Sequence, residues 1–173
     1  MKNFKLPLLA LALCLGFSAK AQQSATATAT ASIVAAVSCS QGENNLAFGA
    51  MNPDATAATT LALSPAETTL ATTGGSGSLI LYTFLPRTAA DFNVTGIGTA
   101  NYTVTLPNSA TLTNQTDGTT QMTVDNFTTN LTSNIGTLID GASTFYVGGT
   151  LNISGAQPVG SYSGTFQVTV NYN

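Results

Sequence analysis

The sequence predicts an all-β fold, an antiparallel immunoglobulin-like β-sandwich of about eight or nine strands. After residue 21, no segment of about ten or more residues shows helical periodicity. Short stretches of alternating apolar and polar residues are instead separated by turn residues about every 8–12 positions. The clearest alternation covers residues 161–172. Because no linker-like break divides residues 22–173, we expect them to form one domain.

The first 21 residues are predicted to be a cleaved signal peptide. Lys2 and Lys5 precede an apolar stretch at 6–17, and Ala19-Lys20-Ala21 provides small residues at the cleavage site. The apolar stretch is too short to span a bilayer. We therefore expect export through the inner membrane to the periplasm, the cell surface or the extracellular space, with no membrane insertion after cleavage.

Charge and cysteine content exclude several classes of partner. Of the four cations only Arg87 remains after residue 21, against seven acidic residues. Binding to nucleic acid or to an anionic membrane requires clustered Lys or Arg, so both are excluded. Cys39 is the only cysteine left, so an intramolecular disulfide is impossible. We expect Cys39 to be a small buried apolar residue rather than an intermolecular bridge.

The first predicted element is a strand or arm at residues 25–37. Alanine alternates there with Thr and Ser, and the apolar side chains become larger at Ile33 and Val37. This pattern favours a strand with a frayed beginning.

The other strands follow from short apolar runs that end at turn residues. Residues 79–85 form a continuous apolar run, which predicts a strand buried on both faces and stopped by Pro86. In the strand at 145–153, Gly148-Gly149 predicts a bulge or a close backbone approach. The remaining strands are expected at 46–49, 59–63, 92–96, 102–106, 122–127 and 161–172.

Residue types argue against catalysis. Histidine is absent, which excludes Ser-His and Cys-His nucleophiles and histidine-containing metal sites. Paired carboxylates could serve a carbohydrate-active enzyme, and the candidates occupy turns or strand starts where Asp commonly caps the backbone. The sequence contains no loop with the Asp-x-Asp spacing that is typical of calcium-binding sites. We therefore assign no catalytic, cofactor or metal residue; the carboxylates considered are Asp91, Asp117, Asp125 and Asp140.

Several blocks resemble a known family. They are Leu46-Ala-Phe-Gly49 with Pro53, Phe92-Asn-Val-Thr-Gly96, Met122-Thr-Val124, Phe145 to Leu151 and Gly160 to Tyr172. Together they resemble the domain-of-unknown-function 4402 family of secreted bacterial β-sandwich proteins, over most of the chain from about Ala27. No activity is established for that family, so the resemblance implies a class rather than a task.

The ending is also similar to that of spore coat protein U domains and of fimbrial subunits assembled by the chaperone–usher route. Such pilins lack one strand of the sandwich, which the N-terminal extension of the next subunit supplies. Tyr172 matches their penultimate aromatic residue, and Gly160 matches their glycine fourteen places from the end. The resemblance implies strand addition by other copies or related subunits, and a periplasmic chaperone. The residues implied in strand pairing are Ile33, Val37, Gly160, Phe166, Val168, Val170 and Tyr172.

The leading functional hypothesis is a noncatalytic, exported structural or adhesive cell-surface protein, with pilin-like assembly by strand complementation. The alternative is a self-contained secreted or periplasmic binding module, in which residues 25–37 pair in their own sheet. Two features differ from many pilins: the missing disulfide, and an alanine-rich arm that loses about 0.8 kcal/mol for each buried CH₂ it lacks. A carbohydrate-active enzyme is the third hypothesis.

Overall fold

The computed structural model describes residues 23–66, 72–74 and 79–173. The predicted signal peptide at 1–21 therefore lies outside the described residues. The chain divides into two units, residues 1–33 and residues 34–173. No helix in the described part is long and apolar enough to cross a membrane.

The second unit is built from antiparallel strands, and a single turn of 3-10 helix, η1 (Thr132–Asn134), interrupts them. Every strand pairing in the described residues is antiparallel, which confirms the predicted all-β antiparallel sandwich. The strands are β1 (Ser38–Gln41), β2 (Ala50–Asn52), β3 (Thr59–Leu63), β4 (Thr72–Gly74), β5 (Ile80–Tyr82), β6 (Ala90–Thr95), β7 (Asn101–Thr105), β8 (Ser109–Asn114), β9 (Gln121–Thr129), β10 (Ile135–Thr137), β11 (Ala142–Ile153), β12 (Tyr162–Ser163) and β13 (Thr169–Tyr172).

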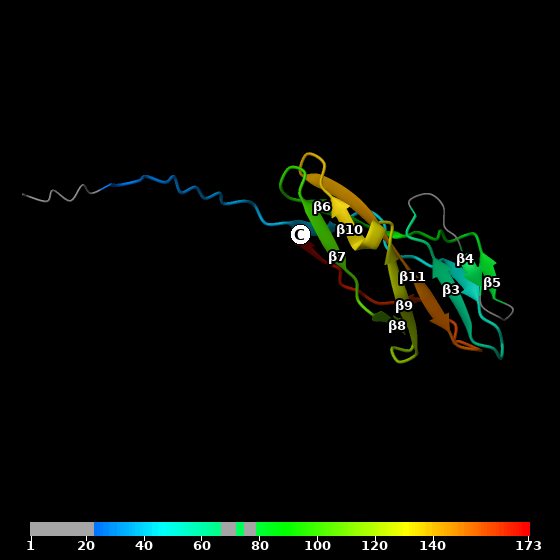
Figure 1. The fold of residues 1–173 in the computed structure, drawn as a ribbon. Helices are drawn as coiled ribbons and strands as arrows, with labels where there is room; N and C mark the ends of the chain where they lie inside the picture. The colour runs from blue at the N-terminus through cyan, green and yellow to red at the C-terminus, as the bar shows by residue number, and fades with distance from the viewer. Residues whose placement is uncertain (1–22, 67–71, 75–78) are drawn as a thin grey trace, which may run out of the picture. The chain divides into compact units, whose positions relative to one another are not determined.

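Strand β11 is the axis of the fold. It lies in the largest sheet, of order β1-β6-β11-β9-β8-β12, and one edge of β11 pairs first with β6 and then with β3. Figure 1 shows β11 running between β6, β7 and β10 at one end and β3, β4 and β5 at the other. Its alternating inner side chains are fully buried, as the period-2 pattern predicts; these are Phe145, Val147, Leu151 and Ile153.

Two apolar cores follow β11. A second sheet, β10-β7-β13, faces the main sheet, so that Tyr102 and Val104 of β7 pack with Val94, Phe145 and Val147. We call this the lower core. The upper core gathers around β3 and the end of β11, and its buried residues are Phe48, Leu61, Leu63, Val124, Leu151 and Ile153.

A bulge lies opposite the glycine pair of β11. The pairing register with β9 shifts between Gly148 and Thr150, and Asn126 in β9 has a φ of 47°. A side chain at Gly148 would overlap the carbonyl oxygen of Leu63. The predicted bulge or close approach is confirmed, and both features are present. A bulge redirects the side chains beside it, and Phe127 packs against both cores.

The strand predicted at residues 79–85 is shorter than expected and is not buried on both faces. Strand β5 pairs only with β2 in the described residues. Leu79 and Leu81 pack against the upper core, whereas Ile80 and Phe84 are 51% and 72% exposed. The prediction was wrong because a continuous apolar run does not show whether a sheet covers its second face. A short strand also lies at β2 rather than at 46–49, where Ala47 makes only an isolated bridge to Thr88.

Of the strand or arm predicted at residues 25–37, the structure shows no strand. Residues 23–37 are in no strand, residues 23–36 are exposed, and the first strand begins at Ser38. Alternation alone did not form a strand because the alanine side chains bury little apolar area, and no strand among the described residues pairs with them.

The predicted strand at 161–172 is interrupted. Strand β12 pairs with β8 and strand β13 pairs with β7, whereas residues 164–168 between them are in no strand. The segment passes from one sheet to the other, so one continuous ladder is impossible. Its alternating apolar side chains are half-buried rather than fully buried.

Candidate functional site at the open edge of β13

Strands β1 and β13 both border the lower core, and each lacks a partner on one side in the described residues. In the described residues β13 pairs only with β7, in the register Thr169 opposite Thr105 to Tyr172 opposite Tyr102. Strand β1 pairs only with β6. The two strands lie close to each other but share no ladder. The backbone groups on these edges are therefore available to a further strand.

The apolar side chains along this seam are incompletely covered. On β7, Tyr102 and Val104 are 0% and 2% exposed. The neighbouring strand β13 points Val170 and Tyr172 at the same lower core, and both are only half-buried. The same holds for the other seam residues, Val37, Cys39, Phe166 and Val168. A row of partly exposed apolar side chains beside an unpaired edge is the surface expected of a sandwich that has room for another strand.

Phe166 holds the irregular segment 164–168 in place. Its ring stacks on Phe127 with centroids 5.0 Å apart, and its edge meets Phe92 at 6.0 Å. Phe92 in turn stacks on the buried Phe145 at 5.4 Å. Aromatic pairs at these distances contribute about 0.5–1.5 kcal/mol each beyond the burial of their area. Packing therefore fixes this segment although it has no ladder hydrogen bonds.

Tyr172 fixes one end of the seam. Its hydroxyl accepts a hydrogen bond from the Ile97 amide (2.9 Å) and donates one to the Ala35 carbonyl (3.3 Å). A side chain at Gly96 would overlap that hydroxyl, so the turn after β6 depends on glycine there. The residues leading into β1 are thus tied to the last residues of β13.

Gly160 lies away from the seam. It has a φ of +152°, and a side chain there would overlap the amide group of Asn114. Asn114 is fully buried, donates to the Val159 carbonyl (3.2 Å) and accepts from the Thr116 amide (2.8 Å). Gly160 therefore allows the connection between β11 and β12 to pack closely against β8.

The structure brings together five of the seven predicted site residues: Val37, Phe166, Val168, Val170 and Tyr172. Ile33 belongs to the first unit and is fully exposed, and Gly160 packs elsewhere. Sequence reasoning did not place Cys39, Phe92 or Phe127 at the seam. For Cys39 the available signal was its period-2 spacing from Val37; burial raises the pKa of its thiol.

The candidate carboxylates are scattered, and two of them, Asp91 and Asp117, cap backbone amides. Asp91 accepts hydrogen bonds from the amides of Glu43 (3.2 Å) and Asn44 (2.6 Å). Asp117 accepts from Thr120 and Thr119, and these bonds, above all that from the Thr120 hydroxyl, lower its pKa to about 2. In the described residues no group of three His, Cys, Asp or Glu side chains could hold a metal ion.

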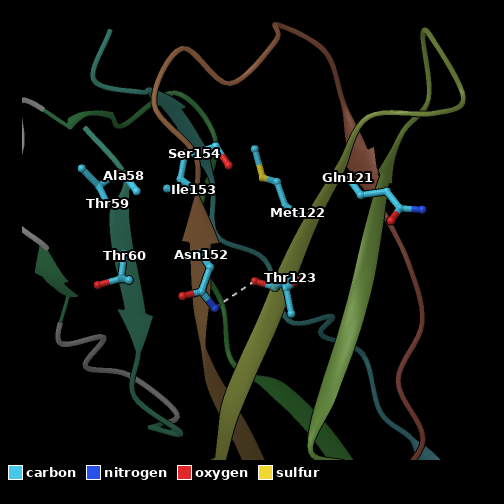
Figure 2. Close-up of a pocket in the computed structure, with 9 residues that line it drawn as sticks. All are labelled: Ala58, Thr59, Thr60, Gln121, Met122, Thr123, Asn152, Ile153 and Ser154. Atoms are coloured by element: carbon cyan, nitrogen blue, oxygen red, sulfur yellow. Dashed lines mark hydrogen bonds between the residues drawn. The ribbon is translucent and has the colours of Figure 1, made fainter. Parts of the chain in front are cut away.

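The surface also contains a shallow cavity of about 410 Å³ at the ends of β3, β9 and β11. Figure 2 shows its neutral lining, which includes Thr60, Met122 and Asn152, with the Asn152 amide donating to the Thr123 carbonyl at 3.3 Å. No carboxylate lines this cavity. It does not bring any of the predicted acidic candidates together.

The sequence profile of one family, described as a domain of unknown function, DUF4402, matches residues 37–172. The chain belongs to the DUF4402 family. The resemblance expected from the sequence is thereby confirmed for this family. The DUF4402 match begins at Val37 and ends at Tyr172, so it includes the open edges of β1 and β13 and leaves out residues 23–36. No curated protein matches the chain.

Proposed function

We propose that this DUF4402 protein is an exported, noncatalytic structural or adhesive component of the cell surface that assembles by strand complementation, like a pilin subunit. The observation that carries the proposal is the seam beside β13, where a half-exposed apolar row accompanies an unpaired edge. An added strand would gain main-chain hydrogen bonds and would cover these alternate side chains.

The donor would be the N-terminal segment at residues 23–37, which is exposed up to residue 36. It is in no strand, and Ile33 is 102% exposed. Alternation places Ala25, Ala27, Ala29, Ala31 and Ile33 on one side of an extended chain. Complete burial of one isoleucine contributes about 1.5–3 kcal/mol, so Ile33 would be the main anchor of the donated segment.

A second copy or a related subunit is a better donor than the chain itself. The Tyr172–Ala35 hydrogen bond holds the start of the second unit at the Tyr172 end of β13. A chain that filled its own seam would have to run parallel to β13 and then reverse direction before β1 begins at Ser38. A segment from a neighbouring copy does not need to reverse direction, because it is not followed by β1 of the same subunit. A periplasmic chaperone would occupy the same edge before assembly.

The test compares the exported chain with a variant lacking residues 23–33. We expect the whole chain to form oligomers in sedimentation velocity, and the deletion variant to stay monomeric and to gain thermal stability from an added peptide of residues 23–37. A matched peptide carrying Ile33→Ser should stabilise it much less. The self-contained module would be supported instead if the whole chain is monomeric at every concentration and the deletion variant gains no thermal stability from the peptide.

A further inference from the structure

We propose that copies of this chain stack head to tail through two exposed apolar patches at opposite ends of the second unit, with the donated segment antiparallel to β13. This inference rests on the proposed strand complementation. It adds a second, body-to-body interface with its own residues.

The first patch, here the proximal patch, consists of Val34, Ile97 and Ile139. They are 58%, 37% and 74% exposed. The two loops that carry the isoleucines are joined by hydrogen bonds from Gly96 N to Gly141 O (2.9 Å) and from Gly141 N to Gly98 O (2.8 Å). The Tyr172 hydroxyl binds the Ile97 amide and the Ala35 carbonyl. The proximal patch therefore surrounds the point where the N-terminal segment leaves the second unit.

The second patch, here the distal patch, consists of Ile80, Tyr82, Phe84 and Leu85. They are 51%, 40%, 72% and 51% exposed, and the rings of Tyr82 and Phe84 lie 5.6 Å apart. Arg87 lies beside them and donates from Nη2 to the Tyr82 carbonyl at 3.2 Å. Clustered apolar exposure of this kind marks an interaction surface more often than isolated exposed residues do.

The pairing register places the patches at opposite ends. Strand β1 starts with Ser38 opposite Thr95, and Thr95 directly precedes the loop that carries Ile97 of the proximal patch. The chain then runs antiparallel to β6 and past it, until Ala47 bridges Thr88, which follows the distal patch. Figure 1 agrees, because the C-terminus and β5 lie at opposite ends of the second unit.

Strand direction decides which patches meet. A segment antiparallel to β13 would end at the end of β13 remote from Tyr172, so the donor's proximal patch would reach the acceptor's distal patch. A parallel segment would bring two proximal patches together. Antiparallel pairing is slightly more stable per residue. Residues 25–33 also match the edge at 164–172 in length, since each stretch has nine residues.

Charge favours the antiparallel arrangement as well. The proximal patch carries the exposed Asp140, next to Ile139, and the distal patch carries Arg87, the only cation after residue 21. Head-to-tail stacking brings these opposite charges together, whereas contact between two proximal patches brings two Asp140 carboxylates together. A heterologous contact of this kind does not close between two copies, so the assembly continues beyond a dimer as a filament or a ring.

The test uses the exported chain with Ile139→Asn in the proximal patch. The matched control is Ile135→Asn on β10, an isoleucine that is 45% exposed and lies outside both patches. Assembly is followed by light scattering against concentration. Binding of a peptide of residues 23–37 is measured separately on dilute protein by hydrogen exchange of residues 164–172.

We expect Ile139→Asn to raise the concentration needed for assembly roughly tenfold, which corresponds to about 1.4 kcal/mol. Asp140→Asn should raise it about threefold, and Ile135→Asn should leave it unchanged. All variants should bind the peptide as the unaltered chain does. If the peptide binds but Ile139→Asn assembles like Ile135→Asn, or if only closed dimers form, the stacking inference is wrong. If the unaltered chain does not bind the peptide, the proposed function itself fails.

Discussion

The Tyr172 hydroxyl donates a hydrogen bond to the carbonyl oxygen of Ala35, 3.3 Å away in space and 137 positions away in the sequence. Because Tyr172 is in the last strand and Ala35 leads into the first, this contact sets the end of the seam at which the N-terminal segment departs. It thereby sets the direction from which a neighbouring segment would enter.

Replacing Tyr172 with Phe removes this bond and the one from the Ile97 amide but keeps the ring. We expect a loss of about 1–3 kcal/mol in the free energy of unfolding, since each net hydrogen bond contributes about 0.5–1.5 kcal/mol. Urea denaturation measures it. The control is Tyr82→Phe at an exposed ring on β5, and an equal effect in both variants would show that the Tyr172 hydroxyl has no special role.

Gly160→Ala should destabilise the fold by about 2 kcal/mol or more, because the added methyl group overlaps the buried Asn114 amide. Gly118→Ala is the matched control: Gly118 has a φ of +67° but nothing within 4 Å of the new methyl group. It should cost only the conformational preference, about 1 kcal/mol. Thermal unfolding distinguishes the two, and similar shifts in Tm would contradict the steric explanation.

Asp117 predicts a pH dependence. Its pKa of about 2 in the folded chain, lowered mainly by the Thr120 hydroxyl, lies below the unfolded value of about 3.9. Its stabilising effect is therefore complete above about pH 4 and is lost as the pH falls through about 2. We expect the stability difference between the unaltered chain and Asp117→Asn to shrink from pH 5 to pH 2. A difference that stays constant over that range would contradict the assignment.

Phe166→Ala tests the packing of the seam. We expect a loss of about 2 kcal/mol, less than for a fully buried Phe, because the ring is half-buried against Phe92 and Phe127. Phe84→Ala at the exposed distal patch should change stability by less than about 0.5 kcal/mol yet weaken assembly. Chemical denaturation and light scattering on both variants give the comparison, and equal stability losses would rule out the aromatic anchor.

The fold class was predictable from the sequence, and individual strands were predictable where the local pattern agrees with the tertiary environment. Residues 59–63 and 145–153 alternate because one face is buried, and β3 and β11 include them. Prediction failed where alternation or apolar content had no matching partner. Residues 25–37 pair with no strand in the part of the chain that the structure describes, and the run at 79–85 has only one covered face.

The site was predictable in its residues but not in its geometry. The period-2 pattern identified Phe166, Val168, Val170 and Tyr172, because it depends only on which side of the chain they occupy. That the segment changes sheet near residues 164–168 depends on the positions of β7 and β8, which local sequence does not encode. Strand β8 was missed because its alternation is carried by small or polar residues such as Ala110 and Asn114.

The most direct test of strand addition is hydrogen exchange at residues 164–172 of the dilute protein, with and without a peptide of residues 23–37. An added strand would bond the outer edge of β13, so we expect slower exchange of the amides on that edge and unchanged exchange in the middle of β11. If the exchange of residues 164–172 is the same at saturating peptide concentration, the edge does not accept this strand and the central claim is wrong.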